Sequence, residues 1–208
     1  LTDMDCYGVL PYPLADENQD TYYNRVGHTG ATFITIPFTV EDPEHGSIVK
    51  ITPAGDFSYD ARVDFGSRVV GVQDVHFDSA TDYATQIGTC RTFVFFHEIE
   101  YLFRNNLLKG GDVDNAIVLV EHPLQQSQLD EMAHNFNQPC LSVTGEGYLS
   151  NLTLRFPNEC GRHKMLDLIG DMRLCGGFLK AHVTAVKMGH TINAQATRAI
   201  REAIKNNI

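Results

Sequence analysis

Apolar and polar residues alternate along two stretches in the first third of the chain. Ile34, Ile36, Phe38 and Val40 occupy every second position of one stretch. In the other, residues 57–65, apolar side chains alternate with Ser58, Asp60, Arg62 and Asp64. A period of two buries one side of a strand, so both stretches predict half-buried strands of an antiparallel sheet. Pro37 lacks a backbone donor and places the first strand at an edge.

Apolar residues at helical spacing follow later in the chain. They predict helices over residues 92–106, 127–136, 159–174 and 193–206, the second beginning with Ser127 and Asp130 at capping-box-like spacing. Further strands are predicted over 116–120, 151–156 and 179–185. Strands come first and helices gather later without regular βαβ alternation, which indicates the α+β class. We therefore expect a two-layer sandwich of a mainly antiparallel sheet packed against helices that contain Ile99, Leu166 and Ile200.

The first 30 residues differ from the rest of the chain. They hold two prolines, three glycines and a polar run over residues 16–21, without sustained periodicity. We interpret residues 1–30 as a linker or the remnant of something larger. Residues 31–208 are expected to form the α+β domain.

Composition narrows the function classes. The 208 residues are 43% hydrophobic and 20% charged, which is typical of a chain that buries a core. The net charge of −10, without a block of basic residues, argues against a nucleic-acid binder. Five cysteines, widely spaced and never arranged as CxxC, favour reduced thiols and hence a cytoplasmic location. No apolar run approaches the ~20 residues of a membrane-spanning helix.

The predicted helix over residues 159–174 carries the most informative polar residues. His163, Asp167 and Asp171 recur every four positions and share one stripe, while apolar residues occupy the other sides. A histidine and an aspartate at this spacing can both reach one Zn²⁺. The alternative is a solvated helix surface on which His163 merely pairs with Asp167.

Four short segments carry a family resemblance. They are RTF at 91–93, GGDVDNA at 110–116, RHKMLDLIGD at 162–171 and GHTIN at 189–193. In this order and spacing they resemble the second domain of UDP-3-O-acyl-N-acetylglucosamine deacetylase, the zinc deacetylase of lipid A biosynthesis in Gram-negative bacteria. The resemblance covers residues 32–208, and with it residues 1–30 are expected to be a linker or the remnant of a missing first domain.

The resemblance implies a role for each matching position. His163 and Asp167 match two zinc ligands, His190 matches the histidine that protonates the leaving amine, and Asp171 matches the acid that orients it. Polar groups that face the substrate and the oxyanion are matched by Lys164 and Thr92, and surfaces that contact the nucleotide sugar and acyl chain by Phe93, Phe95, Gly110 and Gly111. For the phenylalanines and glycines, core packing and a glycine-permitted turn are the alternatives.

One departure from the family pattern limits these expectations. The family's third zinc ligand and its general base lie in an HxxEH-like segment, and the chain has no such segment. His97 and Glu98 stand in reversed order, as an exposed polar pair would. The chain therefore supplies half of an active site, and the first domain must come in cis or in trans. Relatives that continue into a dehydratase make a C-terminal fusion a further expectation.

Three hypotheses follow for the chain. The first is the second domain of a deacetylase that acts on UDP-3-O-acyl-N-acetylglucosamine with Zn²⁺ as cofactor. The second is a non-catalytic homologue that binds nucleotide sugar or zinc. The third is an interaction module that keeps the fold for other reasons. Intact residues at positions 163, 167, 171 and 190 favour the first.

Overall fold

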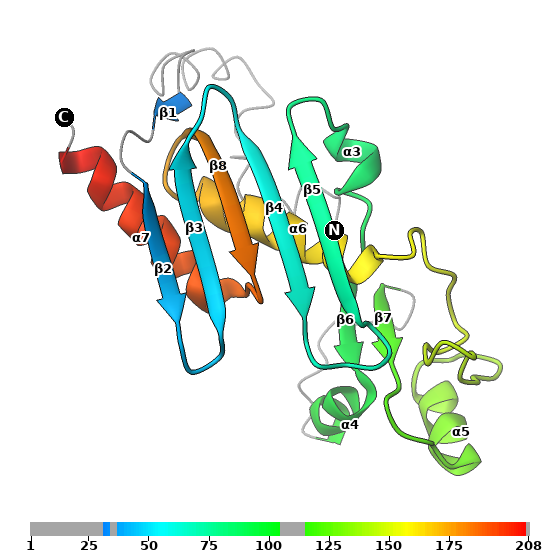
Figure 1. Cartoon of the computed structure of the whole chain (residues 1–208). Helices are drawn as coiled ribbons and strands as arrows, with labels where there is room; N and C mark the ends of the chain where they lie inside the picture. The colour runs from blue at the N-terminus through cyan, green and yellow to red at the C-terminus, as the bar shows by residue number, and fades with distance from the viewer. Residues whose placement is uncertain (1–30, 34–36, 105–114, 207–208) are drawn as a thin grey trace, which may run out of the picture. The chain divides into compact units, whose positions relative to one another are not determined.

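The computed structural model describes residues 31–33, 37–104 and 115–206, which divide into two compact units. Unit 1 comprises residues up to 63, 74–89 and from 161 onward, and unit 2 comprises 64–73 and 90–160. Unit 1 contains all or most of the residues of each of these elements, which Figure 1 labels: β1 (Ala31–Phe33), β2 (Phe38–Asp42), β3 (Ser47–Pro53), β4 (Ser58–Asp64), β5 (Val72–Asp78), α3 (Tyr83–Gln86), α6 (Glu159–Arg173), β8 (Phe178–Val186) and α7 (His190–Asn206).

The strands of unit 1 form one mixed sheet in the order β2-β3-β8-β4-β5, with β1 paired to β8. Strand β8 runs antiparallel to β3 and parallel to β4 and β1. The pairs β2·β3 and β4·β5 are antiparallel (Figure 1). The predicted α+β class is therefore confirmed. Strand β2 lies at the edge of the sheet, as Pro37 predicts.

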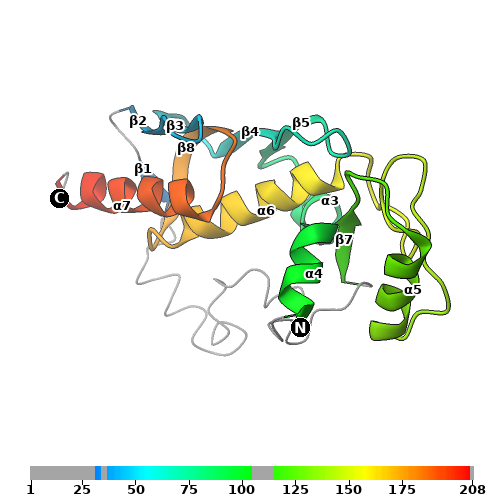
Figure 2. The same cartoon turned by 90° about the horizontal axis from the view of Figure 1, so that it is seen from below.

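Helices α6 and α7 cover one face of this sheet (Figure 2). Strand residues such as Tyr59, Ala61 and Val63 are buried on that side, which confirms the alternation up to residue 63. Phe65 lies beyond the end of β4 and is 40% exposed, so the prediction that it belongs to this buried side is wrong. Leu166 and Ile200 pack into the same core from the two helices. The core follows from two periodicities, two along the strands and 3.6 along the helices.

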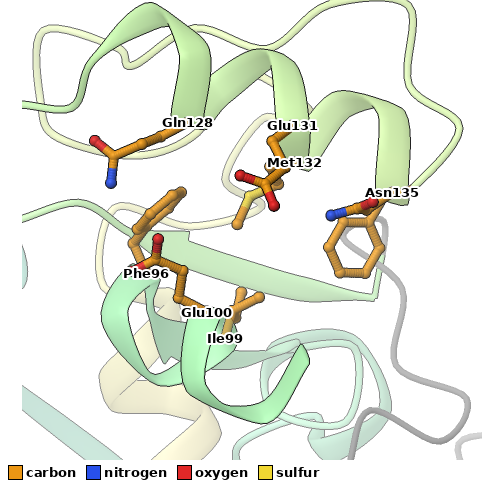
Figure 3. A pocket seen from close by; sticks show the side chains of 8 residues that line it. Phe96, Ile99, Glu100, Gln128, Glu131, Met132 and Asn135 are labelled. Carbon is orange, nitrogen blue, oxygen red and sulfur yellow. The ribbon is translucent and has the colours of Figure 1, made fainter. Parts of the chain in front are cut away.

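Unit 2 contains β6 (Thr92–Phe95), α4 (Phe96–Arg104), β7 (Ala116–Leu119) and α5 (Gln126–Asn135). Strands β6 and β7 pair in parallel. Ile99 and Met132 belong to one buried cluster between α4 and α5. Both residues also line a pocket between these helices, together with Glu100 and Glu131 (Figure 3). The prediction that Ile99 faces the main sheet is therefore wrong, because helical spacing identifies a buried face but not its partner.

Several predicted boundaries are also wrong. Residues 92–95 form a strand rather than the first turn of a helix, because they pair with β7. Residues 151–156 form no strand. Helix α5 begins at Gln126, where Gln128 Oε1 accepts from the Gln125 N–H at 3.0 Å, instead of using Ser127 and Asp130 as a box. Helix α7 begins three residues earlier than predicted, and β3 and β5 were not predicted at all.

Two remaining observations concern the described residues. None of their helices combines the length and the apolar character needed to cross a bilayer. Within the described ranges, no disulfide joins Cys90, Cys140, Cys160 or Cys175.

Candidate active site

Helix α6 carries a polar stripe on the side that does not face the sheet. Met165, Leu168 and Met172 are fully buried against the sheet, so the residues between them point elsewhere. On the polar stripe, His163 Nε2 lies 3.6 Å from Asp167 Oδ1. Lys164 Nζ donates to the other carboxylate oxygen of Asp167, Oδ2, at 2.7 Å. Asp167 thus pairs with His163, as predicted, and also with a lysine.

His190, the first residue of α7, adds a second imidazole to the stripe. Its Nδ1 lies 2.8 Å from Asp171 Oδ2, and its Nε2 lies 3.9 Å from Asp167 Oδ2. The side chain of His190 is 71% exposed, whereas those of Asp167 and Asp171 are 11% and 18% exposed. His190 therefore presents Nε2 to solvent while a mostly buried carboxylate holds its other nitrogen.

The turn before α7 places His190 in this position. Lys187 adopts a left-handed backbone conformation with φ 49°, and its N–H donates to the carbonyl of Arg62 at 2.9 Å. Ser47 Oγ donates to the Lys187 carbonyl at 2.7 Å. Both hydrogen bonds attach the β8–α7 turn to the neighbouring strands β3 and β4. They therefore hold the start of α7 in place relative to the sheet.

Two further residues of α7 hold Asp171. Asn193 Nδ2 donates to Asp171 Oδ2 at 2.9 Å, and Thr197 Oγ1 donates to the Asp171 carbonyl at 2.8 Å. Asn193 is fully buried. Sequence reasoning included Asn193 in the GHTIN segment without giving it a role. Its spacing of three from His190, which puts both on one helix face, was the available signal.

The donor set partly fits a zinc ion. An imidazole nitrogen and a carboxylate oxygen are ordinary zinc ligands, and about 3.4 Å separates two ligands bound tetrahedrally at about 2.1 Å. The 3.6 Å between His163 and Asp167 is close to that separation. Across the described ranges, however, no group of three or more His, Cys, Asp or Glu residues is arranged to hold a metal ion. Among the described residues, His163 Nε2 and Asp167 Oδ1 are therefore two donor atoms at a separation that one zinc ion could bridge.

The other predicted site residues belong to unit 2 or lie outside the described residues. Thr92 is exposed at the start of β6. Phe93 and Phe95 are half-buried and pack against the cluster that contains Ile117 and Tyr148, in agreement with the core-packing alternative. Gly110 and Gly111 lie outside the described residues.

Arg91, the first residue of the RTF segment, has a structural partner that sequence reasoning missed. Its Nε and Nη2 donate to the two oxygens of Glu159 at 2.9 and 3.0 Å. Glu159 is completely buried. Burial raises the pKa of this carboxyl, but hydrogen bonds from Arg91 and Arg155 outweigh burial and leave the pKa below its usual range.

A second polar cluster lies on the sheet face opposite α6 and α7. His76 Nδ1 lies 2.7 Å from Asp60 Oδ1, and His182 Nε2 lies 3.3 Å from Asp60 Oδ2. Ser58 Oγ lies 2.8 Å from His182 Nδ1. The hydrogen bond to Asp60 raises the pKa of His76. We refer to Ser58, Asp60, His76 and His182 as the sheet-face cluster.

Fold and side chains together define an α+β protein with two histidines, two aspartates and a lysine gathered around two helices. Residues 20–135 and 132–202 match the family model described as UDP-3-O-acyl N-acetylglycosamine deacetylase, and the chain belongs to that family. It is 34% identical, over 94% of its length, to a protein of Porphyromonas gingivalis named bifunctional enzyme LpxC/FabZ.

Proteins named UDP-3-O-acyl-N-acetylglucosamine deacetylase are also similar to the chain. The protein from Syntrophotalea carbinolica is 34% identical over 85% of the chain, and that from Trichormus variabilis is 29% identical over 90%. The chain spans only part of each relative: 44% of the Porphyromonas protein, 50% of the Syntrophotalea protein and 63% of the Trichormus protein.

Proposed function

We propose that this chain supplies part of the active site for zinc-dependent deacetylation of UDP-3-O-acyl-N-acetylglucosamine, a step of lipid A biosynthesis in the cytoplasm of a Gram-negative bacterium. The observation that carries the proposal is the gathering of His163, Lys164, Asp167, Asp171 and His190 around α6 and the start of α7. Family membership, and the names of the relatives, support the substrate class.

His190 acts on the leaving group in this proposal. Its Nδ1–H donates to Asp171, which fixes the ring and leaves Nε2 free to carry the transferable proton. Protonated Nε2 delivers that proton to the amine nitrogen as the acetamide C–N bond breaks. Asp171 stays ionised and stabilises the imidazolium. The exposure of His190 allows a substrate to reach it.

His163 and Asp167 would hold the zinc ion. When bound, Zn²⁺ supplies Lewis acidity at the acetamide carbonyl. Lys164 donates to Asp167 Oδ2, the oxygen not paired with His163, and orients this carboxylate. Thr92 is proposed to donate to the developing oxyanion. For the sugar and the acyl chain we propose contacts with Phe93, Phe95, Gly110 and Gly111.

The remaining parts of the site are proposed to come from outside this chain. A third zinc ligand and a general base would complete the chemistry, supplied by a first domain in cis or in trans. The chain spans about half the length of its relatives, which leaves room for such a domain. Because one relative is named as a bifunctional LpxC/FabZ enzyme, we also propose a dehydratase domain as a fusion partner.

The test measures turnover and bound zinc for the chain alone and for a protein that restores the first domain. We expect negligible turnover by the chain alone, because general-base assistance contributes about 10²- to 10⁴-fold. In the complete protein, His190→Ala should lower the rate and keep the metal, whereas Asp167→Ala should lose both. His182→Ala, in the sheet-face cluster, is the matched control and should change neither. An inactive complete protein would favour the non-catalytic hypotheses.

A further inference from the structure

Asn193 stands out among the buried polar residues of unit 1. It is 0% exposed, and among the residues that the structure describes its side chain forms a hydrogen bond only with the Asp171 carboxylate, at 2.9 Å from Nδ2. Its carbonyl oxygen Oδ1 is buried and accepts no hydrogen bond. An unsatisfied buried acceptor lowers stability, so packing alone would favour an apolar residue here.

Asp171 Oδ2 is the shared acceptor of two side chains from α7. It accepts from His190 Nδ1 at 2.8 Å and from Asn193 Nδ2 at 2.9 Å. A carboxylate held by one donor can rotate about its terminal torsion, which is broad and soft. A second donor on the same oxygen removes that freedom and fixes the direction from which the imidazole is held.

The two donors come from one helix face. His190 and Asn193 are three residues apart in the first turn of α7, so their side chains project to the same side. Helix α7 is in turn attached to Asp171 by Thr197 Oγ1, which donates to the Asp171 carbonyl at 2.8 Å. Backbone and carboxylate of Asp171 are thus held by separate residues.

We propose that Asn193 is a positioning residue, which acts through Asp171 to hold His190 in the tautomer with the proton on Nδ1 and Nε2 directed outward. The expected effect on kcat rests on the proposed function. The expected His190 tautomer rests on the hydrogen-bond geometry. Without the Asn193 donor, the Asp171 carboxylate turns. The neutral ring of His190 then samples both tautomers, and the protonated ring directs its Nε2–H at the leaving group less often.

The kinetic test uses Asn193→Leu and Asn193→Ala in the complete protein. Both variants should lower kcat about 10- to 100-fold with little change in KM, the range typical of lost outer partners. Asn193→Leu also removes the unsatisfied oxygen, so its thermal stability should stay near that of the wild type while kcat falls. Thr52→Val, which removes a part-buried hydrogen bond to the His182 carbonyl and touches neither Asp171 nor α7, should lower kcat by less than about threefold.

A double-variant comparison separates positioning from general damage. In a His190→Ala background, Asn193→Leu should change the residual rate less than about twofold, since its effect passes through His190. If the two substitutions instead lower the rate by the product of their separate effects, the proposal is overturned. It is also overturned if Asn193→Leu and Asn193→Ala both keep the wild-type kcat while His190→Ala inactivates the enzyme.

A spectroscopic readout keeps the inference testable whatever the activity. The ¹⁵N shifts of the His190 ring, assigned by their absence in His190→Ala, should report one Nδ1–H tautomer in the wild type at a pH where the shifts themselves show a neutral ring. Asn193→Leu should shift the population toward a mixture. An unchanged tautomer would overturn the proposal. A shift in a protein without deacetylase activity would support positioning and reject only the proposed function.

Discussion

At the scale of single residues, Asp60 links two histidines on the face of the main sheet opposite α6 and α7. His76 Nδ1 and His182 Nε2 approach its two oxygens at 2.7 and 3.3 Å. The hydrogen bond with Asp60 favours the protonated imidazole and raises the pKa of His76. At pH values between the pKa of His76 in the unfolded protein and its higher pKa in the folded protein, His76 therefore binds a proton when the protein folds.

This uptake predicts a pH-dependent stability. The contribution of His76 is fully present below its unfolded pKa of about 6.5 and is lost as pH rises through the higher folded value. His76→Gln should therefore flatten the decline in the free energy of unfolding above about pH 6.5, measured by urea denaturation at several pH values. Asp60→Asn removes the negative charge beside His76 Nδ1 and should flatten the decline in part, because Asp78 remains 3.3 Å from His76 Nε2. Unchanged slopes in both variants would contradict the assignment.

At the scale of elements, the Arg91–Glu159 pair ties the residue before β6 to the first residue of α6. Glu159 accepts from the Arg91 backbone and guanidinium and from the Arg155 N–H at 2.7 Å. Each of these donors compensates a charge that has no access to water. Removing the guanidinium would leave the carboxylate with only backbone donors.

Arg91→Ala is accordingly expected to destabilise the protein by about 3–5 kcal/mol, the cost of an uncompensated buried charge. The matched control is Arg62→Ala, which also removes a two-pronged ion pair, with Asp74 at 2.7 and 2.8 Å. Those side chains are 59% and 63% exposed, so the control should cost only about 0–1 kcal/mol. Equal losses in urea denaturation would show that the Glu159 site is not closed to water.

At the scale of the whole molecule, the chain's share of its relatives determines what it can bind alone. It spans 44–63% of three relatives, and its described residues provide two candidate zinc ligands, His163 and Asp167. Two protein ligands hold zinc much less tightly than a closed four-ligand site. Zinc affinity should therefore depend on residues beyond those that the structure describes.

The chain alone should consequently lose most of its zinc during mild dialysis, and His163→Ala should lower what remains, as measured by elemental analysis. His182→Ala is the matched control, because it also removes an imidazole that lies near an aspartate, at 3.3 Å from Asp60. Equal metal content in the chain and in His163→Ala would contradict the ligand assignment. Retention after dialysis would indicate a third ligand within the chain.

The sequence by itself determined the features that repeat locally. Alternation at Tyr59, Ala61 and Val63 predicted the buried side of β4, and helical spacing predicted α6 with His163 and Asp167 on one stripe. The spaced segments around positions 91, 162 and 189 also predicted the family to which the chain belongs. Such signals can be read from a single sequence because each depends on residues close together in the chain.

Only the tertiary structure decided which distant segments meet. Residues 92–95 became a strand through pairing with 116–119, and β8 paired in parallel with β4 across more than a hundred residues. Ile99 packed in unit 2 instead of against the main sheet, and Asn193 found Asp171. Periodicity shows that a face is buried or polar, but its partner depends on contacts between remote residues, and these carry no signal in a single sequence.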